Sequence, residues 1–199
     1  MRFAWQCLLL FLLSFTFSCK KNTLFEQIPS SYSGVSFNNL VVENDTINPL
    51  DKLNIYNGGG VGIGDFNNDG LQDIFLAGNQ VSNRLYINHG NFKFEDITDE
   101  AGVGGIGGWG RGVAVLDINN DGLLDIYVCN TLLNDPKKRR NLLYINQGPD
   151  KKGVPHFKEM AKEYGLDIDA YSTMASFFDY DNDGDLDMYL AVNRAESSD

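Results

Sequence analysis

One nine-residue pattern occurs three times in this 199-residue chain, at 65–73 (loop 1), 117–125 (loop 2) and 179–187 (loop 3). Each copy reads D-x-[DN]-x-D-G-x-x-D and lies between short apolar runs. Oxygen-bearing side chains at positions 1, 3, 5 and 9, with the carbonyl of position 7, supply the hard oxygen ligands that Ca²⁺ prefers. The glycine at position 6 permits the tight turn that brings these groups together. The sequence therefore predicts about three bound calcium ions.

The candidate ligands occupy equivalent positions in the three loops, and position 7 contributes only its main-chain carbonyl. Loop 3 carries four ligand carboxylates where loops 1 and 2 carry three, so we expect it to bind calcium most tightly. The predicted ligands are Asp65, Asn67, Asp69, Leu71 and Asp73, then Asp117, Asn119, Asp121, Leu123 and Asp125, then Asp179, Asp181, Asp183, Asp185 and Asp187.

The spacing also matches the start of an EF-hand loop, which requires a bidentate glutamate at position 12 and a helix on either side. Position 12 is instead Leu76, Val128 or Leu190, and β-branched and aromatic residues flank the loops. Such short apolar runs are typical of strands buried on both faces. The pattern excludes an EF-hand and predicts β-hairpins whose turns hold the ions.

Two more strand-like segments follow each of loops 1 and 2. A third strand ends in Leu-Tyr-Ile-Asn, at 85–88 and 143–146, and an alternating outer strand begins with Phe at 94 and 157. A further copy of the outer-strand pattern occupies 25–29. The loops begin 52 and 62 residues apart, and the extra residues fall in connecting turns. Four antiparallel strands at this spacing are typical of one blade of a β-propeller.

We therefore predict an all-β fold, a partial β-propeller of four-stranded antiparallel blades with calcium-binding hairpin loops. Residues 61–199 would form two complete blades and an incomplete third, and 24–60 an N-terminal segment with an outer strand. Closed propellers have about four to eight blades, and an early outer strand commonly completes the last one. We expect the chain to be the N-terminal part of a longer protein or a truncated product, with unpaired strand edges.

The net charge of −11 arises mostly from the loops, which hold ten ligand carboxylates. Lys and Arg number 16 against 27 Asp and Glu and form no broad basic stripe, which argues against nucleic-acid binding.

Residues 1–18 have the features of a secretory signal, with one early charge and a short apolar core. The sequence Thr16-Phe17-Ser18-Cys19 resembles a bacterial lipobox, so 1–18 is predicted to be a lipoprotein signal peptide and 19–23 a polar tether. Cys19 would carry the lipid and anchor an exported protein in the cell envelope, at the outer membrane. The alternative is ordinary cleavage and release.

Three other features admit more than one interpretation. The run 109–112 (Trp-Gly-Arg-Gly) suits a ligand contact on a propeller face or packing between blades. The basic run 137–140 suits a solvated loop or a contact with anionic glycans or lipid head groups. Cys129 follows a buried-type strand, which favours an inert core thiol over a reactive one.

The three loops, with the small residues that precede them at 62–64, 113–115 and 175–177, resemble FG-GAP or VCBS repeats. That family includes the calcium-bearing propeller blades of integrin α-chains. The run from 25 to 103 is also similar to the N-terminus of bacterial lipoproteins related to cartilage acidic protein (ASPIC/UnbV-associated). The resemblance covers most of residues 24–193.

The resemblance implies a calcium-binding propeller module of a lipid-anchored envelope protein, which binds or adheres to a protein or glycan ligand and is not an enzyme. One alternative is the scaffold or accessory propeller of a larger secreted hydrolase or lyase, and another is a truncated, non-functional fragment. The sequence contains no nucleophile elbow, pair of catalytic acids or histidine metal cluster that would favour the enzyme.

Overall fold

A computed structural model of the protein describes residues 23–52, 54–105 and 107–193. The predicted signal peptide, Cys19 and nearly all of the tether lie outside these residues, as does 194–199. Strands dominate the described residues and the helices are single turns, so the predicted all-β class is confirmed. None of these helices is long and apolar enough to cross a membrane.

The strands form two four-stranded antiparallel sheets and one two-stranded sheet, and the four-stranded sheets follow chain order. The first sheet holds β1 (Val61–Gly64), β2 (Asp73–Leu76), β3 (Arg84–Asn88) and β4 (Phe94–Asp96). The second holds β5 (Gly110–Leu116), β6 (Asp125–Asn130), β7 (Leu142–Pro149) and β8 (Pro155–Glu159), and the third holds β9 (Ser172–Phe178) and β10 (Asp187–Val192). The helical turns are α2 (Ser30–Ser33), α3 (Thr98–Ala101) and α4 (Pro136–Arg139).

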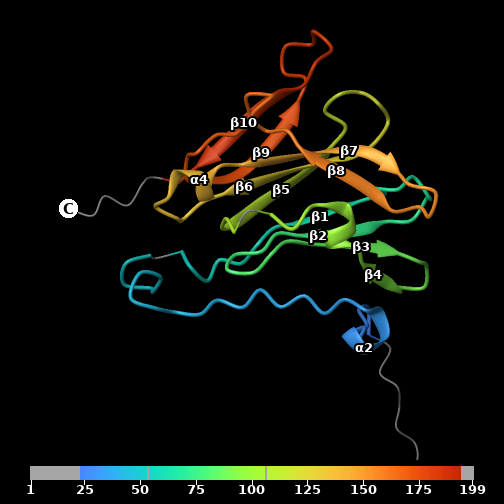
Figure 1. Ribbon diagram of the computed structural model, residues 1–199, viewed down its shortest axis with the longest axis horizontal. Coiled ribbons are helices and arrows are strands. Elements are labelled where there is room, and N and C mark those ends of the chain that lie inside the picture. The colour runs from blue at the N-terminus through green and yellow to red at the C-terminus, as the bar shows by residue number, and fades with distance from the viewer. Residues whose placement is uncertain (1–22, 53, 106, 194–199) are drawn as a thin grey trace, which may run out of the picture.

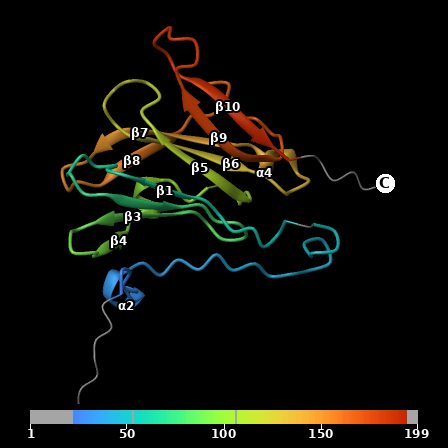
Figure 2. The same ribbon diagram turned by 180° about the vertical axis from the view of Figure 1, so that it is seen from behind.

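The sheets lie side by side in the order of the chain. Figure 1 shows the first sheet between the N-terminal segment and the second sheet, with β9 and β10 on the far side of the second. Figure 2 shows the same order from behind. The arrangement is that of consecutive propeller blades.

Each acidic loop closes a hairpin in the same register. Gly64 pairs with Asp73 at the end of β1 and β2, Leu116 pairs with Asp125, and Phe178 pairs with Asp187. Position 9 of every loop is therefore the first residue of the second strand of its sheet, and positions 1–8 lie beyond the last pair. The repeat seen in the sequence is thus a repeat in backbone geometry.

Strand β6 is buried on both faces, as the apolar runs predict. Ile126 and Val128 pack into the core between the first two sheets, which also contains Phe75. Tyr127 and Cys129 point the other way, into the core shared with β9 and β10. Because successive side chains of a strand alternate in direction, one apolar run fills two cores.

Glycines in the innermost strands allow neighbouring sheets to approach closely. A Cβ added to Gly62 would lie 2.8 Å from methyl groups of both Val113 and Val115. At the next junction, a Cβ on Gly112 would lie 2.5 Å from the carbonyl oxygen of Thr173. The first strands of the three sheets, β1, β5 and β9, can lie close to one another because some of their residues lack side chains.

The outer strand predicted at 25–29 does not form. Residues 24–29 are exposed and contain no strand, and α2 follows them. The alternation there matches that of β4 and β8, but an outer strand of a blade needs a third strand whose outer edge is unpaired. In the described residues β3 already pairs with β4, and β7 with β8. The chain approaches the first sheet after α2, where a Cβ on Gly34 would lie 2.3 Å from the carbonyl oxygen of Phe94.

The close approach at Gly62 predicts that Gly62→Val overpacks the core between the first two sheets. We expect the free energy of unfolding to fall by about 1–3 kcal/mol, measured by urea denaturation. Val61→Ala is the control, because Val61 is the preceding residue and is 55% exposed. An unchanged urea midpoint for Gly62→Val would contradict the packing described.

Candidate metal centres

The three loops continue from the ends of β1, β5 and β9, and loops 1 and 2 touch. The Asn68 amide donates to the carbonyl oxygen of Gly122 at 3.3 Å. The buried Asn146 amide donates to the Phe66 carbonyl at 2.8 Å and so ties the second sheet to loop 1. Loop 1 is therefore held in place by the neighbouring sheet and loop as well as by its own hairpin.

The first carboxylate of each loop accepts main-chain N–H groups from the turn. Asp65 accepts from the N–H groups of Asp69 at 3.0 Å and Gly70 at 2.7 Å. Asp117 and Asp179 make the same two contacts in their loops. The position 1 side chain thus sits inside the concave side of the turn, where a ligand oxygen must lie.

Two residues of each loop have left-handed backbone conformations. Position 6 is the predicted glycine, with φ of 88° at Gly70. Position 4 is the second, with φ of 58° at Asn68, 55° at Asn120 and 61° at Asn182. Asparagine is among the few non-glycine residues that tolerate this region. Sequence reasoning did not identify position 4, although asparagine occupies it in all three copies.

The position 9 carboxylates of loops 1 and 2 are fully buried. One oxygen of Asp73 accepts the N–H of Phe66 at 2.9 Å, and the other accepts the N–H of Asn88, at the end of β3, at 2.8 Å. Asp125 makes the equivalent contacts with Ile118 and Asn146. Each carboxylate oxygen keeps a second lone pair that could reach a metal.

Sequence reasoning also did not identify the third-strand asparagine, Asn88 or Asn146, as a contact of the loop. Beyond its main-chain contact with Asp73, the Asn88 amide donates to the Gln72 carbonyl at 2.8 Å. Asn146 makes the equivalent contact with the carbonyl of Leu124 at 3.2 Å. The sequence signal was the shared Tyr-Ile-Asn ending of both third strands.

Burial raises the pKa of Asp73 to about 6, against the opposing effect of the N–H groups of Asn88 and Phe66. Repulsion by Asp69 and Asp65 raises it further. Burial likewise raises the pKa of Asp125. In the exposed loop 3, a main-chain N–H bond from Asp185 lowers the pKa of Asp183, while the side-chain bond between them raises that of Asp185.

Loop 3 brings three carboxylates together. Ligand atoms of Asp179, Asp181 and Asp187 all lie within 4.8 Å of one another. Position 3 is asparagine in loops 1 and 2, which is why only loop 3 presents a cluster of three acids at positions 1, 3 and 9. Asp183, at position 5, is not part of this group and accepts the N–H of Asp185 at 3.1 Å.

Position 5 behaves alike in the other loops. Asp69 accepts the N–H of Leu71 at 2.8 Å, and Asp121 accepts that of Leu123 at 2.9 Å. The carboxylates of positions 1 and 5 thus both accept main-chain N–H groups of the turn. Within the described residues, no ion pair neutralises a loop carboxylate. Such a set of oxygens suits a divalent cation, whose charge would offset their mutual repulsion.

Trp109 and Cys129 are both buried in the interior of the fold. Trp109 is 1% exposed and packs with Ile55 and Leu132, so the packing interpretation holds for this residue. Cys129 is buried, and burial raises the pKa of its thiol to about 12, which keeps it neutral and unreactive.

The basic run is only partly solvated. The Arg139 guanidinium stacks on the ring of Tyr171 at 4.4 Å and donates to the Leu133 carbonyl at 2.8 Å, and Arg140 pairs with Asp167. The solvated-loop interpretation is therefore wrong for Arg139, which is half-buried, whereas Arg140 is exposed and keeps its contact with water. Their spacing in sequence gives no sign of these partners.

Residues 65–128 match the model of the FG-GAP-like repeat family. The chain is similar to cartilage acidic protein 1 of Xenopus tropicalis, with 33% identity over 140 residues, which is 69% of this chain and 20% of the relative. It is also 32% identical over 134 residues to the protein of the same name from Mus musculus, covering 67% of this chain and 19% of that protein. The chain thus spans about a fifth of the length of the curated relatives it matches.

The buried contacts of Asp73 predict a stability effect that is independent of metal. Asp73→Ala leaves two buried main-chain N–H groups without an acceptor, so we expect the free energy of unfolding to fall by about 2 kcal/mol or more. The measurement is urea denaturation in EDTA. Asp69→Ala, in the same loop but exposed, should change it by less than about 0.5 kcal/mol. Equal effects of the two substitutions would contradict the anchoring role of position 9.

Proposed function

We propose that the chain is a calcium-binding β-propeller module, because residues 65–128 match the FG-GAP-like repeat family and 69% of the chain is similar to cartilage acidic protein 1. The observation that carries the proposal is the convergence of Asp179, Asp181 and Asp187 in loop 3, within a turn whose backbone recurs in loops 1 and 2. We infer about three ions, one in each loop.

Calcium fits these loops better than the other common divalent ions. Every candidate ligand is an oxygen of a carboxylate, an amide or a carbonyl, and the loops contain no histidine or cysteine for a softer metal. Calcium accepts six to eight oxygens in flexible geometry, whereas magnesium requires near-ideal octahedral geometry and retains several waters. In this proposal the ions are structural, since each would neutralise a group of carboxylates held at the end of a hairpin.

We propose that the module binds a protein or glycan ligand and does not catalyse a reaction. The clustered carboxylates serve as calcium ligands in this proposal, which makes them poor general acids or bases. Propeller faces suit recognition, because loops from several blades meet there on a rigid scaffold.

We propose further that the protein is exported and lipid-anchored through Cys19, at the outer membrane of a bacterial cell. The support is the signal-like sequence 1–18, followed by a cysteine and a short polar segment.

A calcium titration of the chain by calorimetry, with folding checked by circular dichroism, tests the metal proposal. We expect about three sites, of which the tightest is lost in Asp179→Ala. Asp181→Asn gives loop 3 the position 3 residue of the other loops, so its affinity should fall toward theirs. Asp99→Ala, an exposed aspartate of α3, is the control. A folded chain that binds no calcium would refute the proposal.

Cell fractionation tests the anchor. In a bacterial host that processes lipoproteins, we expect the chain in the membrane fraction and Cys19→Ser in the soluble fraction, because the substituted residue cannot be acylated. Cys129→Ser, at the buried thiol, is the matched control and should remain with the membranes. The anchor proposal fails if both variants fractionate like the parent chain.

A further inference from the structure

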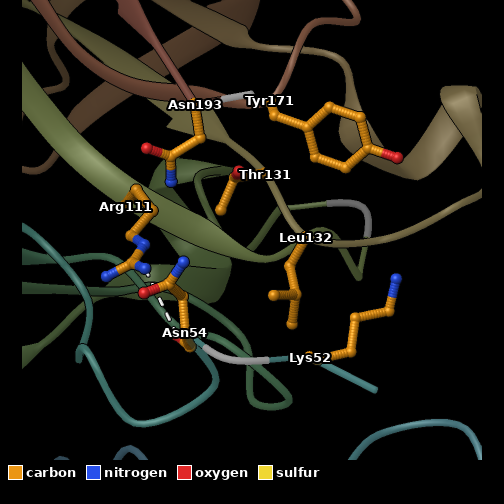
Figure 3. Close-up of a pocket in the computed structure, with 7 residues that line it drawn as sticks. All are labelled: Lys52, Asn54, Arg111, Thr131, Leu132, Tyr171 and Asn193. Carbon is orange, nitrogen blue, oxygen red and sulfur yellow. Dashed lines mark hydrogen bonds between the residues drawn. The ribbon is translucent and has the colours of Figure 1, made fainter. Parts of the chain in front are cut away.

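Two adjoining hollows lie where the innermost strands begin, at the end opposite to the acidic loops. The larger has a volume of about 460 Å³ and is lined by the chain entering β1 (57–59), by the start of β5 (111–112) and by Thr173 of β9. The smaller, about 40 Å³, shares Asn54, Arg111 and Asn193 with it and extends to Lys52 and Tyr171. Figure 3 shows the side chains around the smaller hollow, with Arg111 beside Asn54.

Arg111 is a half-buried cation without an acidic partner among residues 23–52, 54–105 and 107–193. Its buried Nε has no hydrogen-bond partner there, and one terminal nitrogen donates to the Asn54 carbonyl at 3.2 Å. A guanidinium offers five N–H donors, so most of its capacity is unused. Burial lowers its pKa, which reports the cost of removing this charge from water.

The hollows carry positive charge in a chain of net charge −11. Arg111 and Lys52 line the smaller hollow, and the Arg139 guanidinium lies over the ring of Tyr171 at its edge. No carboxylate lines either hollow within the described residues. An anionic group would be attracted to the hollow beside Arg111, whereas the carboxylates of the acidic loops would repel it.

The remaining lining is rich in groups that both donate and accept hydrogen bonds. Asn54, Asn57 and Asn193 contribute amides, Thr173 a hydroxyl, and the adjacent glycines exposed main chain. Apolar side chains contribute little to the larger hollow, and Leu132 lines only the smaller one. Such a surface matches the hydroxyl groups of a sugar better than the mixed side chains of a peptide.

We propose that this face of the propeller binds an acidic sugar, a uronate whose carboxylate pairs with Arg111 and whose hydroxyl groups contact the surrounding amides. The inference deepens the proposed binding function and rests on it for its biological meaning. The planar guanidinium fits a carboxylate through two parallel N–H bonds, a geometry that lysine cannot reproduce.

The test is a titration of the calcium-saturated chain with D-glucuronate. Binding is monitored by saturation-transfer NMR, and D-glucose is the neutral comparison. We expect glucuronate to bind and glucose to bind at least about tenfold more weakly, because the charge-assisted bonds are lost. Arg111→Gln should weaken glucuronate binding by about tenfold or more, and Arg111→Lys by an intermediate factor. Arg84→Gln is the control, since Arg84 is the arginine of β3 and pairs with Asp96 away from the hollows.

The inference would be overturned if the chain did not bind glucuronate or if glucose bound equally tightly. It would also be overturned if Arg111→Gln bound glucuronate as tightly as the parent chain. Tighter binding of the peptide acetyl-Gly-Glu-Gly-amide than of glucuronate would overturn the sugar assignment in favour of an acidic peptide. Glu196 and Asp199 lie outside the described residues, and Glu196→Gln/Asp199→Asn controls for an internal competitor. That variant should bind glucuronate at least as tightly as the parent.

Calcium binding is measured in the same samples by calorimetry, which separates the two proposals. A chain that binds calcium but not glucuronate refutes the acidic-sugar site and leaves the calcium module standing. A folded chain that binds no calcium refutes the module whatever glucuronate does. Arg111→Gln must retain the parent's calcium isotherm and circular dichroism, so that a loss of sugar binding reports the site itself.

Discussion

A buried carboxylate joins each of the first two acidic loops to the sheet behind it. Asp73 accepts one N–H from its own loop and another from the end of β3, and Asp125 does the same with β7. The loop cannot shift without breaking a contact at the edge of the third strand. Charge in the loop and order in the sheet are therefore coupled, and an ion that holds the loop together also holds the hairpin to its neighbour.

The fold could be predicted because its signals are local. The hairpin strands flank a turn pattern of fixed length, and the third and outer strands of the first two sheets repeat with it. The asparagine at position 4 of the loops recurs in the same local way, but its left-handed conformation concerns the backbone and does not follow from ligand chemistry. The contact between Asp73 and Asn88, which are fifteen residues apart in sequence, was not predictable, since it depends on how β2 and β3 align.

The errors have a common physical origin, which is that a local pattern does not specify its partner. The alternation at 25–29 equals that of β4, yet in the described residues β3 and β7 already pair with their own outer strands. Arg139 looks solvated in sequence, but its guanidinium stacks on the ring of Tyr171, which is distant in the sequence. The surroundings of a side chain that contacts residues distant in the sequence, such as Arg111, become known only from the assembled strands.

Sheets whose strands follow chain order have a consequence for assembly. In each four-stranded sheet every strand pairs with its immediate predecessor, so a blade can close before the next one has been synthesised. Contacts of short sequence separation form quickly, because little loop-closure entropy is lost before they are made. The junctions between β1, β5 and β9, which contain the glycines described above, can then form one at a time. Each completed sheet packs on the one before it. A completed sheet can therefore serve as the folded surface on which the next sheet of the chain packs.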